Sequence, residues 1–528
     1  MRTTTWRVAL ACAIPVVLAG CNGSAPSASG PATSTFTIAM ESLTNSMEPS
    51  AWDNASHRFA LDPVKATLVQ YKDYEQTGGK VPGPADMEPA LATTYEVGAD
   101  GITMTLGTAK SAAGNTLSPE DVKYTFERVV GVKDTVGTFL MTNAGIDPAN
   151  PVTITGEHEV RINAKPTALS LLSLDAYNFA ILDSTVVESH ATADDPWASQ
   201  WLTTNTAMFG AYTVTAFTPG TSVAMEANPN YDGELGYPKV VIQAVPDAAA
   251  RVVLAKTGKA QMVAGLPLAT IKTLAADPAV KVVTTPTPGQ DFLELNKNFA
   301  PFKDPAVRRA ISQALDRTAL AAGPYSGLAT PATSIVASTI NAQNSTSPYF
   351  QHDIEAAKAA LAAAGQSNLT FTITTNSASI SSVPVDSLLT TLQQQLAAVG
   401  ITVEVATVPA AADFTAGYRA GKYEAFIRVE SPVAADPVFL LNAFHSTKGV
   451  SNYANDDDPA VDAAIAAATP LSGDERLAAI APGIASANDL MPDVPLVELT
   501  NQYIYPASVC LGTQSNSRWF DPAVAAPC

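Results

Sequence analysis

The sequence predicts a large α/β protein that folds into two or three lobes. Its 528 residues are 47% hydrophobic and 15% charged, so it can bury a great deal of apolar surface, and one hydrophobic core rarely grows to this size. The C-terminal half contains a βαβ pattern, with strands predicted over 369–375 and 401–408 and a helix over 384–399. Such a crossover places its two strands parallel in one sheet. The earlier part is richer in predicted hairpins.

Alternation of apolar and polar side chains defines the strands of the first half. Residues 35–39 alternate and predict an early strand. Residues 93–97 and 102–106 alternate on either side of an Asp-Gly turn and predict a hairpin. A second hairpin is predicted over 211–227, where a Pro-Gly pair stands in the order that a type II turn prefers.

Capping residues mark the helices. Ser118 suits an N-cap, a proline follows it at the first helical position, and Asp121 falls in the positively polarised first turn. A helix that begins at 304–305 carries an apolar stripe at i, i+3, i+4 and i+7, so one face meets a core. An alanine-rich helix over 353–364 is stopped by Gly365.

The N-terminal segment indicates export. A positively charged start precedes an apolar run over 8–19, which is too short to span a bilayer as a helix. The run ends in Leu-Ala-Gly-Cys, which resembles the lipobox of bacterial lipoproteins. We therefore predict a lipoprotein signal peptide over 1–20, lipidation of Cys21 and a flexible tether over 21–34 rich in Ser, Ala, Gly and Pro. The alternative is an ordinary secretory signal in which Cys21 is incidental.

Cysteine use and charge narrow the remaining possibilities. With Cys21 lipidated, Cys510 and Cys528 form the only internal pair that the mature chain offers, and an oxidising compartment favours a disulfide between them over two free thiols. The formal net charge of -19 argues against a nucleic-acid partner, because phosphates would be repelled. The acidity says little about the ligand.

Six segments, in order, resemble the family 5 extracellular solute-binding proteins of ABC importers, the dipeptide, oligopeptide and nickel-binding group. The first covers 87–97 and the Asp-Gly pair at 100–101, and the second covers 118–128, which opens with Ser-Pro-Glu-Asp-Val. The third is Asn-Pro-Asn-Tyr at 228–231, and the fourth covers 255–262. The fifth consists of the runs 292–296, 301–304 and 307–317 together, and the sixth is the last stretch over 421–462. The resemblance spans most of the mature chain.

This resemblance implies a periplasmic-binding-protein-like fold: two α/β lobes joined by a hinge of paired crossover strands, with a third, smaller lobe inserted in the first. Projected onto this chain, lobe I takes 35–74, 205–285 and 489–528, the inserted lobe II takes 75–204, and lobe III takes 286–488. It also implies that a small molecule or peptide is enclosed between the lobes and passed to the permease subunits of an importer. We expect a monomer at the extracytoplasmic face of the cell membrane, held by its lipid anchor.

The resemblance suggests ligand-binding residues, with departures. In oligopeptide-binding relatives an aspartate three positions after a strand tryptophan receives the ligand's amino group; here Val433 stands at the aspartate position and Glu430 at the tryptophan position. Glu430 or Asp436 could replace that carboxylate. The alternatives are a surface charge for Glu430 and a helix cap for Asp436. The other predicted ligand contacts, each with core packing as its alternative, are Trp52, Phe292 and Glu498.

Enzyme motifs are absent from the sequence. It contains no Gly-x-Ser-x-Gly elbow, no Ser-x-x-Lys and no His-Glu-x-x-His, and its five histidines are scattered. We therefore predict a binding protein with no catalytic residues, cofactor or metal. The acidic run 456–458 fits a helix cap better than a calcium site. A hydrolase is the less favoured alternative, and a surface chaperone or adhesin on the same fold stays open.

Overall fold

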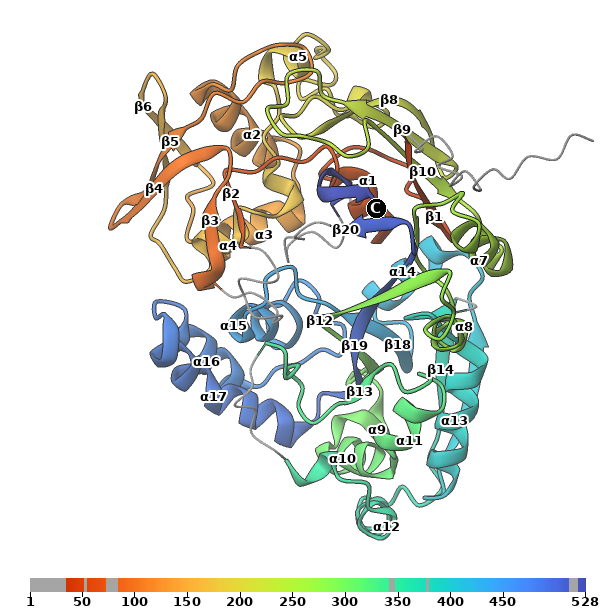
Figure 1. The fold of residues 1–528 in the computed structure, drawn as a ribbon. Helices are drawn as coiled ribbons and strands as arrows, with labels where there is room; N and C mark the ends of the chain where they lie inside the picture. Colours follow the sequence, from red (N-terminus) through yellow and green to blue (C-terminus); the bar gives the residue numbers. More distant parts are fainter. Residues whose placement is uncertain (1–34, 52–54, 73–83, 341–346, 377–378, 512–520) are drawn as a thin grey trace, which may run out of the picture. The chain divides into compact units, whose positions relative to one another are not determined.

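The computed structural model describes residues 35–51, 55–72, 84–340, 347–376, 379–511 and 521–528 (Figure 1). Cys21 and Trp52, two of the predicted functional residues, lie outside these ranges. Within them, no helix combines the length and the apolar character that crossing a bilayer requires.

One large mixed sheet organises the described chain. Its eleven strands follow the spatial order β17 (Thr402–Thr407), β14 (Thr370–Thr375), β18 (Ala425–Glu430), β12 (Val280–Leu295), β19 (Asp493–Pro506), β11 (Met262–Val263), β1 (Thr35–Met40), β10 (Lys239–Ala244), β9 (Ser222–Ala227) and β8 (Tyr212–Thr218), with β13 (Thr330–Pro331) against β19. The predicted βαβ crossover is confirmed, since β14 and β17 pair in parallel and α13 (Val385–Ala397) joins them.

The two longest strands, β12 and β19, lie side by side at the centre of this sheet (Figure 1). They pair antiparallel from Val280 opposite Pro506 to Glu294 opposite Asp493, and the register shifts between Pro286 and Gln290. On one flank, β12 pairs with β18 of the C-terminal α/β part. On the other flank, β19 pairs with β11, which leads to β1. The implied α/β fold with paired crossover strands is therefore present.

A separate four-stranded antiparallel sheet lies within the segment predicted as the inserted lobe. Its order is β4 (Ala92–Gly98), β5 (Gly101–Leu106), β7 (Glu159–Asn163) and β6 (Val152–Gly156). The predicted hairpin is β4 and β5. The helix predicted after it is α2 (Pro119–Gly131), and Ser118 and Asp121 form a complete capping box at its start. The exact lobe boundaries stay predictions.

The other helices surround the main sheet. Those of the first part are α1 (Ala55–Leu61), α7 (Ala248–Lys256) and α8 (Leu268–Leu274). Those of the later part are α9 (Ala300–Lys303), α10 (Pro305–Ala314), α11 (Arg317–Ala322), α12 (Ile354–Ala363), α14 (Ala411–Arg419), α15 (Pro437–Leu440), the π-helical turn η4 (Leu441–His445), α16 (Pro459–Ala468) and α17 (Gly473–Leu490). The predicted helices at 304–305 and 353–364 correspond to α10 and α12, each capped by an aspartate.

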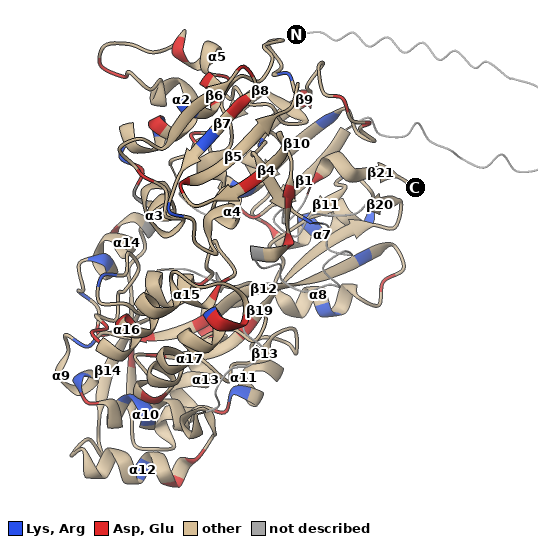
Figure 2. Ribbon diagram, turned by 90° about the vertical axis from the view of Figure 1, so that its left-hand side faces the viewer, with Lys and Arg blue, Asp and Glu red and all other residues tan. Residues whose placement is uncertain are grey.

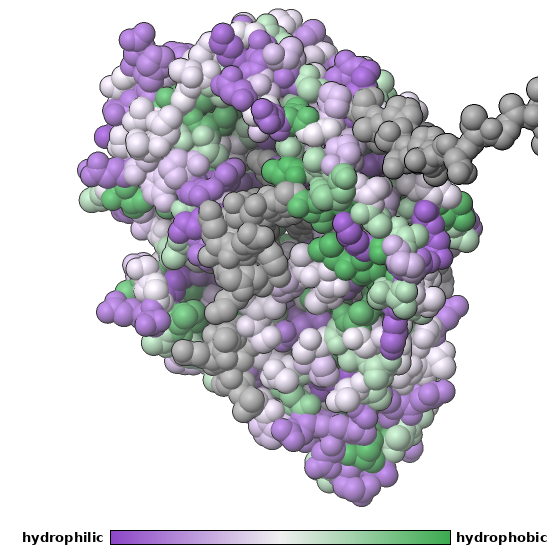
Figure 3. All heavy atoms as spheres, in the orientation of Figure 1, coloured by the Kyte–Doolittle hydropathy of each residue, from purple (hydrophilic) through white to green (hydrophobic). Residues whose placement is uncertain are grey.

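Buried apolar side chains form separate clusters under these layers. One cluster lies between β14, β17 and α13, and a second lies under β1, β9 and β10. A third lies mainly in the inserted segment and also includes Ala434, Phe439 and Ala443. A smaller fourth cluster joins Phe292 of β12 to α15, α16 and α17. On the face shown in Figure 3, hydrophilic and hydrophobic residues are mixed. The division of the core agrees with a chain too long for one hydrophobic centre.

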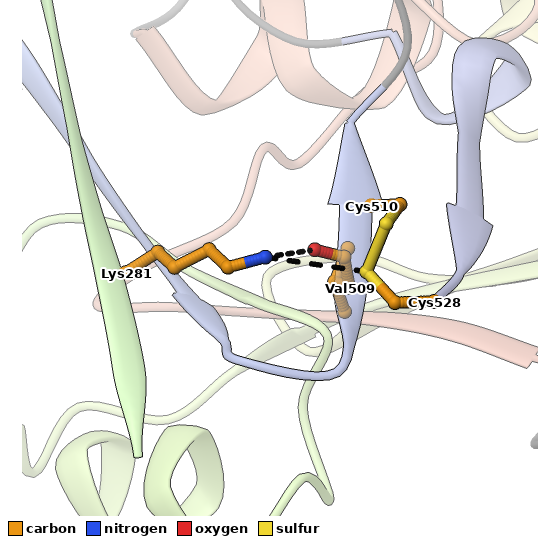
Figure 4. Close-up of a disulfide and its surroundings, with 4 residues drawn as sticks. All are labelled: Lys281, Val509, Cys510 and Cys528. Atoms are coloured by element: carbon orange, nitrogen blue, oxygen red, sulfur yellow. Dashed lines mark hydrogen bonds between the residues drawn. A yellow bond between two sulfur atoms is a disulfide. The ribbon is translucent and has the colours of Figure 1, made fainter. Parts of the chain in front are cut away.

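The C-terminal strands are joined by a disulfide between Cys510 and Cys528 (Figure 4). The bond connects β20 (Val509–Leu511) to β21 (Ala525–Pro527), which pair antiparallel. Lys281 of β12 donates a hydrogen bond of 3.1 Å to the carbonyl of Val509. The disulfide thus fastens the end of the chain close to the long central strand.

We expect the double variant Cys510→Ser, Cys528→Ser to unfold at a lower temperature than the wild type. The bridged residues are 18 apart, and closing a loop of this size is worth roughly 3 kcal/mol through the entropy of the unfolded chain. Thermal unfolding with and without reductant measures the effect. Reductant should lower the wild-type midpoint and leave the variant unchanged; equal midpoints under oxidising conditions would contradict the prediction.

Candidate functional site

Polar and charged side chains share one face of the central strands. Gln290 of β12 lies opposite Glu430 of β18 and opposite Glu498 of β19. Two positions further on, Phe292 lies opposite Arg428. Because directly opposed residues share a face and side chains alternate along a strand, these groups gather on one side of the sheet. Acidic segments, coloured red, are visible beside β12 and β19 in Figure 2.

Arg428 is the centre of a buried ion network. Its guanidinium donates to Glu294 of β12 and, at 2.5 Å, to Glu430 of its own strand. Glu294 lies opposite Asp493 of β19. Glu294, Glu430 and Asp493 are at most 1% exposed. Removing one partner from such a buried group typically destabilises a protein by about 3–5 kcal/mol, because the remaining charge is left uncompensated.

His445, the last residue of η4, completes the network from the other side. Its Nδ1 lies 3.1 Å from Asp456 Oδ2, and its Nε2 lies 3.4 Å from Glu430 Oε2. Lys297 contacts the other oxygen of Asp456 at 3.2 Å. The imidazole is 1% exposed. Four segments that are distant in sequence therefore meet at one buried point.

The charges of the network shift one another's pKa values. Burial favours the neutral form of Glu430, but Arg428 and His445 outweigh burial and hold its pKa below the ordinary value. Burial raises the pKa of Asp493 well above its ordinary value, and neighbouring carboxylates add to the effect. Burial alone would lower the pKa of His445, yet Glu430 and Asp456 raise it well above the ordinary value.

Glu430, predicted as a ligand contact, is paired with Arg428 and His445 of this network. It is 1% exposed, so the alternative of a surface charge is wrong: α15, η4 and the loop before α16 cover the strand end. Its role in ligand binding stays a prediction. Val433, at the position of the missing aspartate, is 41% exposed.

Asp436 caps helix α15, as the alternative interpretation proposed. Its Oδ1 accepts a hydrogen bond of 2.9 Å from the backbone N–H of Phe439. The same carboxylate accepts two bonds from Arg476 of α17, at 2.9 and 2.8 Å. Asp436 therefore has a complete structural explanation, and a ligand contact by this residue also stays a prediction.

The other predicted contacts lie on the central strands. Phe292 is fully buried in the cluster under α15 to α17, and its ring centroid is 6.4 Å from that of His445. Glu498 accepts hydrogen bonds from the backbone N–H and the hydroxyl of Ser338, at 3.0 and 2.6 Å. The structure thus brings Phe292, Glu430 and Glu498 to the same part of the sheet, where their contact with a ligand stays untested.

Arg428, His445, Asp456 and Asp493 were not predicted from the sequence as members of one cluster. Arg428 and Glu430 alternate with apolar residues, a pattern that predicts a solvated strand face. Asp456 was attributed to the cap of α16, but the cap is Asp458, whose side chain accepts from Ala460. A usable signal was the presence of charges in both 292–296 and 425–430, two strands expected near the centre of the sheet.

The segment that carries His445 also contacts the inserted segment. Asn442 of η4 donates a hydrogen bond of 2.6 Å to the side chain of Asn143 at the end of α3 (Thr135–Asn143). Nearby, Phe439 and Phe139 meet edge to face with centroids 5.7 Å apart. The element above the buried network is therefore also a contact between the predicted lobes II and III.

The opposite face of β12 carries a buried aspartate of its own. Asp291 accepts hydrogen bonds of 2.6 Å from both Tyr325 and Ser381, and its exposure is 0%. Burial raises the pKa of Asp291 to about 6, although both hydroxyl donors work against the increase. Because this raised pKa depends on burial, the effect of Asp291 on the pH dependence of stability reports on the folding of the central strands.

Together, the sheet with its paired crossover strands and the separate inserted sheet define a protein of the lobed solute-binding class. A family model described as bacterial extracellular solute-binding proteins, family 5, middle region, matches residues 86–452. The chain therefore belongs to the family 5 extracellular solute-binding proteins.

Curated relatives and solved structures agree with this assignment. The chain is 27% identical over 389 residues to the probable D,D-dipeptide-binding periplasmic protein DdpA of Escherichia coli K12, covering 72% of this chain and 71% of the relative. It is 29% identical over 240 residues to the E. coli K12 glutathione-binding protein GsiB, covering 41% and 46%.

Among solved structures, the fold is similar to that of the Helicobacter pylori periplasmic binding protein DppA in complex with peptide STSA, with a TM-score of 0.79, 21% identity and coverage of 93% and 98%. It is also similar to that of Haemophilus influenzae OppA in complex with the peptide RPPGFSPFR, with a TM-score of 0.78, 18% identity and coverage of 94% and 99%. At these identities the likeness concerns the fold alone.

We expect Asp291→Asn to remove part of the protein's pH dependence. The pKa of the Asp291 carboxyl is raised from 3.8 to about 6 in the folded protein. Between these pH values the folded state therefore keeps a proton that the unfolded state has lost. The stability that this proton contributes is lost as pH rises through 6. The loss amounts to about 3 kcal/mol at most. Urea unfolding midpoints at pH 4 and 7.5 measure it, with the exposed Asp232→Asn as control. An equal wild-type and Asp291→Asn response to pH would contradict the prediction.

Proposed function

We propose that this protein binds a peptide or peptide-like compound outside the cytoplasmic membrane and delivers it to the permease subunits of an ABC importer, without changing it chemically. The observation that carries the proposal is the pair β12 and β19, which connects the two halves of the main sheet in a member of this family. The relatives support the ligand class, since they are described as dipeptide- or glutathione-binding proteins or have structures in complex with peptides.

The central strands offer a physical means for the halves to move. Their ladder is interrupted between Pro286 and Gln290. Within the interruption, Pro288 has no N–H to donate, and the N–H of Gly289 is bonded to the Thr287 hydroxyl at 2.7 Å rather than to β19. A break of this kind allows rotation at one point while the pairing on either side stays intact. Ligand contacts made in the closed form then offset the free energy of closure.

The same region indicates whether a carboxylate of the protein binds the α-amino group of a peptide ligand. Both carboxylates that could receive an ammonium are already paired, Glu430 with Arg428 and His445, and Asp436 with Arg476. The position of the family's aspartate is the exposed apolar Val433. Glu498, the remaining predicted carboxylate contact, already accepts two hydrogen bonds from Ser338. We infer that a bound peptide makes no charge-assisted contact through its α-amino group.

We expect the purified full chain in mild detergent to bind one peptide-like molecule per chain. Native mass spectrometry should show a retained ligand or a one-to-one complex with members of a pool of di-, tri- and tetrapeptides, and the melting temperature should rise on binding. N-acetylation of a bound peptide should change its Kd by less than about tenfold. A hydrogen bond from the charged amino group to a carboxylate would be worth roughly 1.5–3 kcal/mol, and we expect no such bond to be lost.

Matched peptides separate the parts of this proposal. Acetylated and free forms of one sequence test the amino group alone, and Val433→Asp should create a preference for the free amine. A loss of more than a hundredfold on acetylation in the wild type would refute the inferred absence of an amine contact. The absence of any bound peptide in the pool would refute the ligand class.

We also propose that Cys21 is lipidated and holds the protein at the membrane. Replacing Cys21 with serine should move the protein from the membrane fraction to the soluble exported fraction and abolish incorporation of a labelled fatty acid. Cys510→Ser serves as control, because it changes a cysteine without touching the Leu-Ala-Gly-Cys motif. Unchanged labelling in the Cys21 variant would contradict the anchor.

A further inference from the structure

The buried network contains an arrangement that its ion pairs do not explain. Glu430, His445 and Asp493 each offer a potential metal-ligand atom, and these atoms all lie within 4.8 Å of one another. All three residues are at most 1% exposed. Among the described side chains, His445 Nε2, Glu430 Oε2 and both Asp493 oxygens are buried without a hydrogen-bond partner. Such groups are costly unless something else satisfies them.

The surrounding contacts orient these atoms as metal ligands are usually oriented. Asp456 Oδ2 lies 3.1 Å from His445 Nδ1, and Asp493 Oδ2 lies 3.6 Å from the same nitrogen. The closer carboxylate, Asp456, can accept the Nδ1 proton and leave the Nε2 lone pair free. This is the carboxylate–histidine arrangement that accompanies metal-bound imidazole. Arg428 holds Glu430 through Oε1 only, which leaves Oε2 free, 3.4 Å from His445 Nε2. Two ligands about 2.0–2.1 Å from a tetrahedral ion lie roughly 3.3–3.4 Å apart.

Carboxylates outnumber the permanent cations of the network. Its four carboxylates are Glu294, Glu430, Asp456 and Asp493, and its three cations are Arg428, Lys297 and Arg308, which interacts with Asp456 and Asp493. With a neutral imidazole, the excess is one negative charge. A bound cation is therefore favoured electrostatically, and a proton on the imidazole would otherwise supply the missing positive charge.

A small pocket lies beside the same imidazole, next to α16 and α17. It is lined by His445 and Asp456 together with Lys297, Arg308 and Asp458. The pocket thus places a small open volume next to the imidazole and the carboxylate that orients it.

We propose that Glu430, His445 and Asp493 bind one divalent transition-metal ion of the zinc class, with Asp456 positioning the imidazole. The site is structural: it joins β18, η4 and β19, and it fixes the element through which Asn442 contacts Asn143 of the inserted segment. An imidazole ligand among carboxylates favours zinc, cobalt or manganese over calcium and magnesium, which prefer all-oxygen sites. The proposal does not depend on the identity of the transported ligand.

Metal binding to the purified full chain in mild detergent tests the proposal directly. After treatment with a chelator and its removal, Zn²⁺ added alone should bind with one equivalent per chain that survives gel filtration, and it should raise the melting temperature. Co²⁺ in its place should give ligand-field absorption characteristic of mixed nitrogen and oxygen coordination. Ca²⁺ and Mg²⁺ at the same concentration should do neither.

Variants assign the binding to these residues. His445→Gln and Glu430→Gln keep similar volume and should weaken Zn²⁺ binding by more than about a hundredfold, whereas Asp456→Asn should weaken it about 10–100-fold, as loss of an orienting partner does. The matched controls are His352→Gln, a surface histidine 3.7 Å from Asp316, and Asp474→Asn, an exposed aspartate at the start of α17. Both controls should bind Zn²⁺ like the wild type.

The outcomes are decisive even where a variant fails to fold. Less than one tenth of an equivalent of Zn²⁺, Co²⁺ or Mn²⁺ on the folded wild type would overturn the proposal and leave protons as the occupants of the network. Unchanged affinity in folded Glu430→Gln or His445→Gln would overturn it as well, because the ion would then lie elsewhere. If those two variants do not fold, the wild-type stoichiometry, the Co²⁺ spectrum and Asp456→Asn decide the question.

Discussion

The antiparallel pairing of β12 with β19 is the constraint on which the rest of the structure depends. These strands are the only described connection within the sheet between the side that ends in β17 and the side that ends in β8. Their register fixes which residues of the two halves oppose each other, from Val280 and Pro506 to Glu294 and Asp493. A slip by one residue would turn every side chain to the other face. The buried charges and the core under α15 to α17 would then both be lost.

The same register explains why charged residues occur in the middle of a sheet. Arg428 lies opposite Phe292 and so stands diagonally from Glu294 and two residues from Glu430. Arg428 therefore contacts both Glu294 and Glu430, and His445 of η4 contacts Glu430 from outside the sheet. Apolar residues of similar volume often stabilise a fold as well as a buried ion pair does. The polar cluster is therefore weak evidence for stability alone, and its connections to η4 and β19 fit the proposed metal-binding role.

The elements that could be predicted from the sequence are those set by local signals. Ser118 with Asp121, the Asp-Gly turn before β5 and Gly365 after α12 each act within a few residues, and the structure has all of these elements. The network could not be predicted, because its members come from strands and turns up to about two hundred residues apart, and register is a tertiary property. Glu430 shows the difference: its alternation with apolar neighbours matches a solvated strand, but the later helices cover that face.

The break in the ladder of β12 and β19 lies next to the buried network, and this position bears on the proposed motion of the two halves of the sheet. The ladder of β12 and β19 breaks between Pro286 and Gln290, and the charged cluster begins on the next paired residues. Gln290, held to the Ser334 carbonyl by a hydrogen bond of 3.1 Å, separates the break from the cluster. The proposed rotation at the break would leave the contacts of the network within β12, β18 and η4 unchanged. Because η4 also contacts α3, the proposed metal ion would fix the element that the inserted segment contacts.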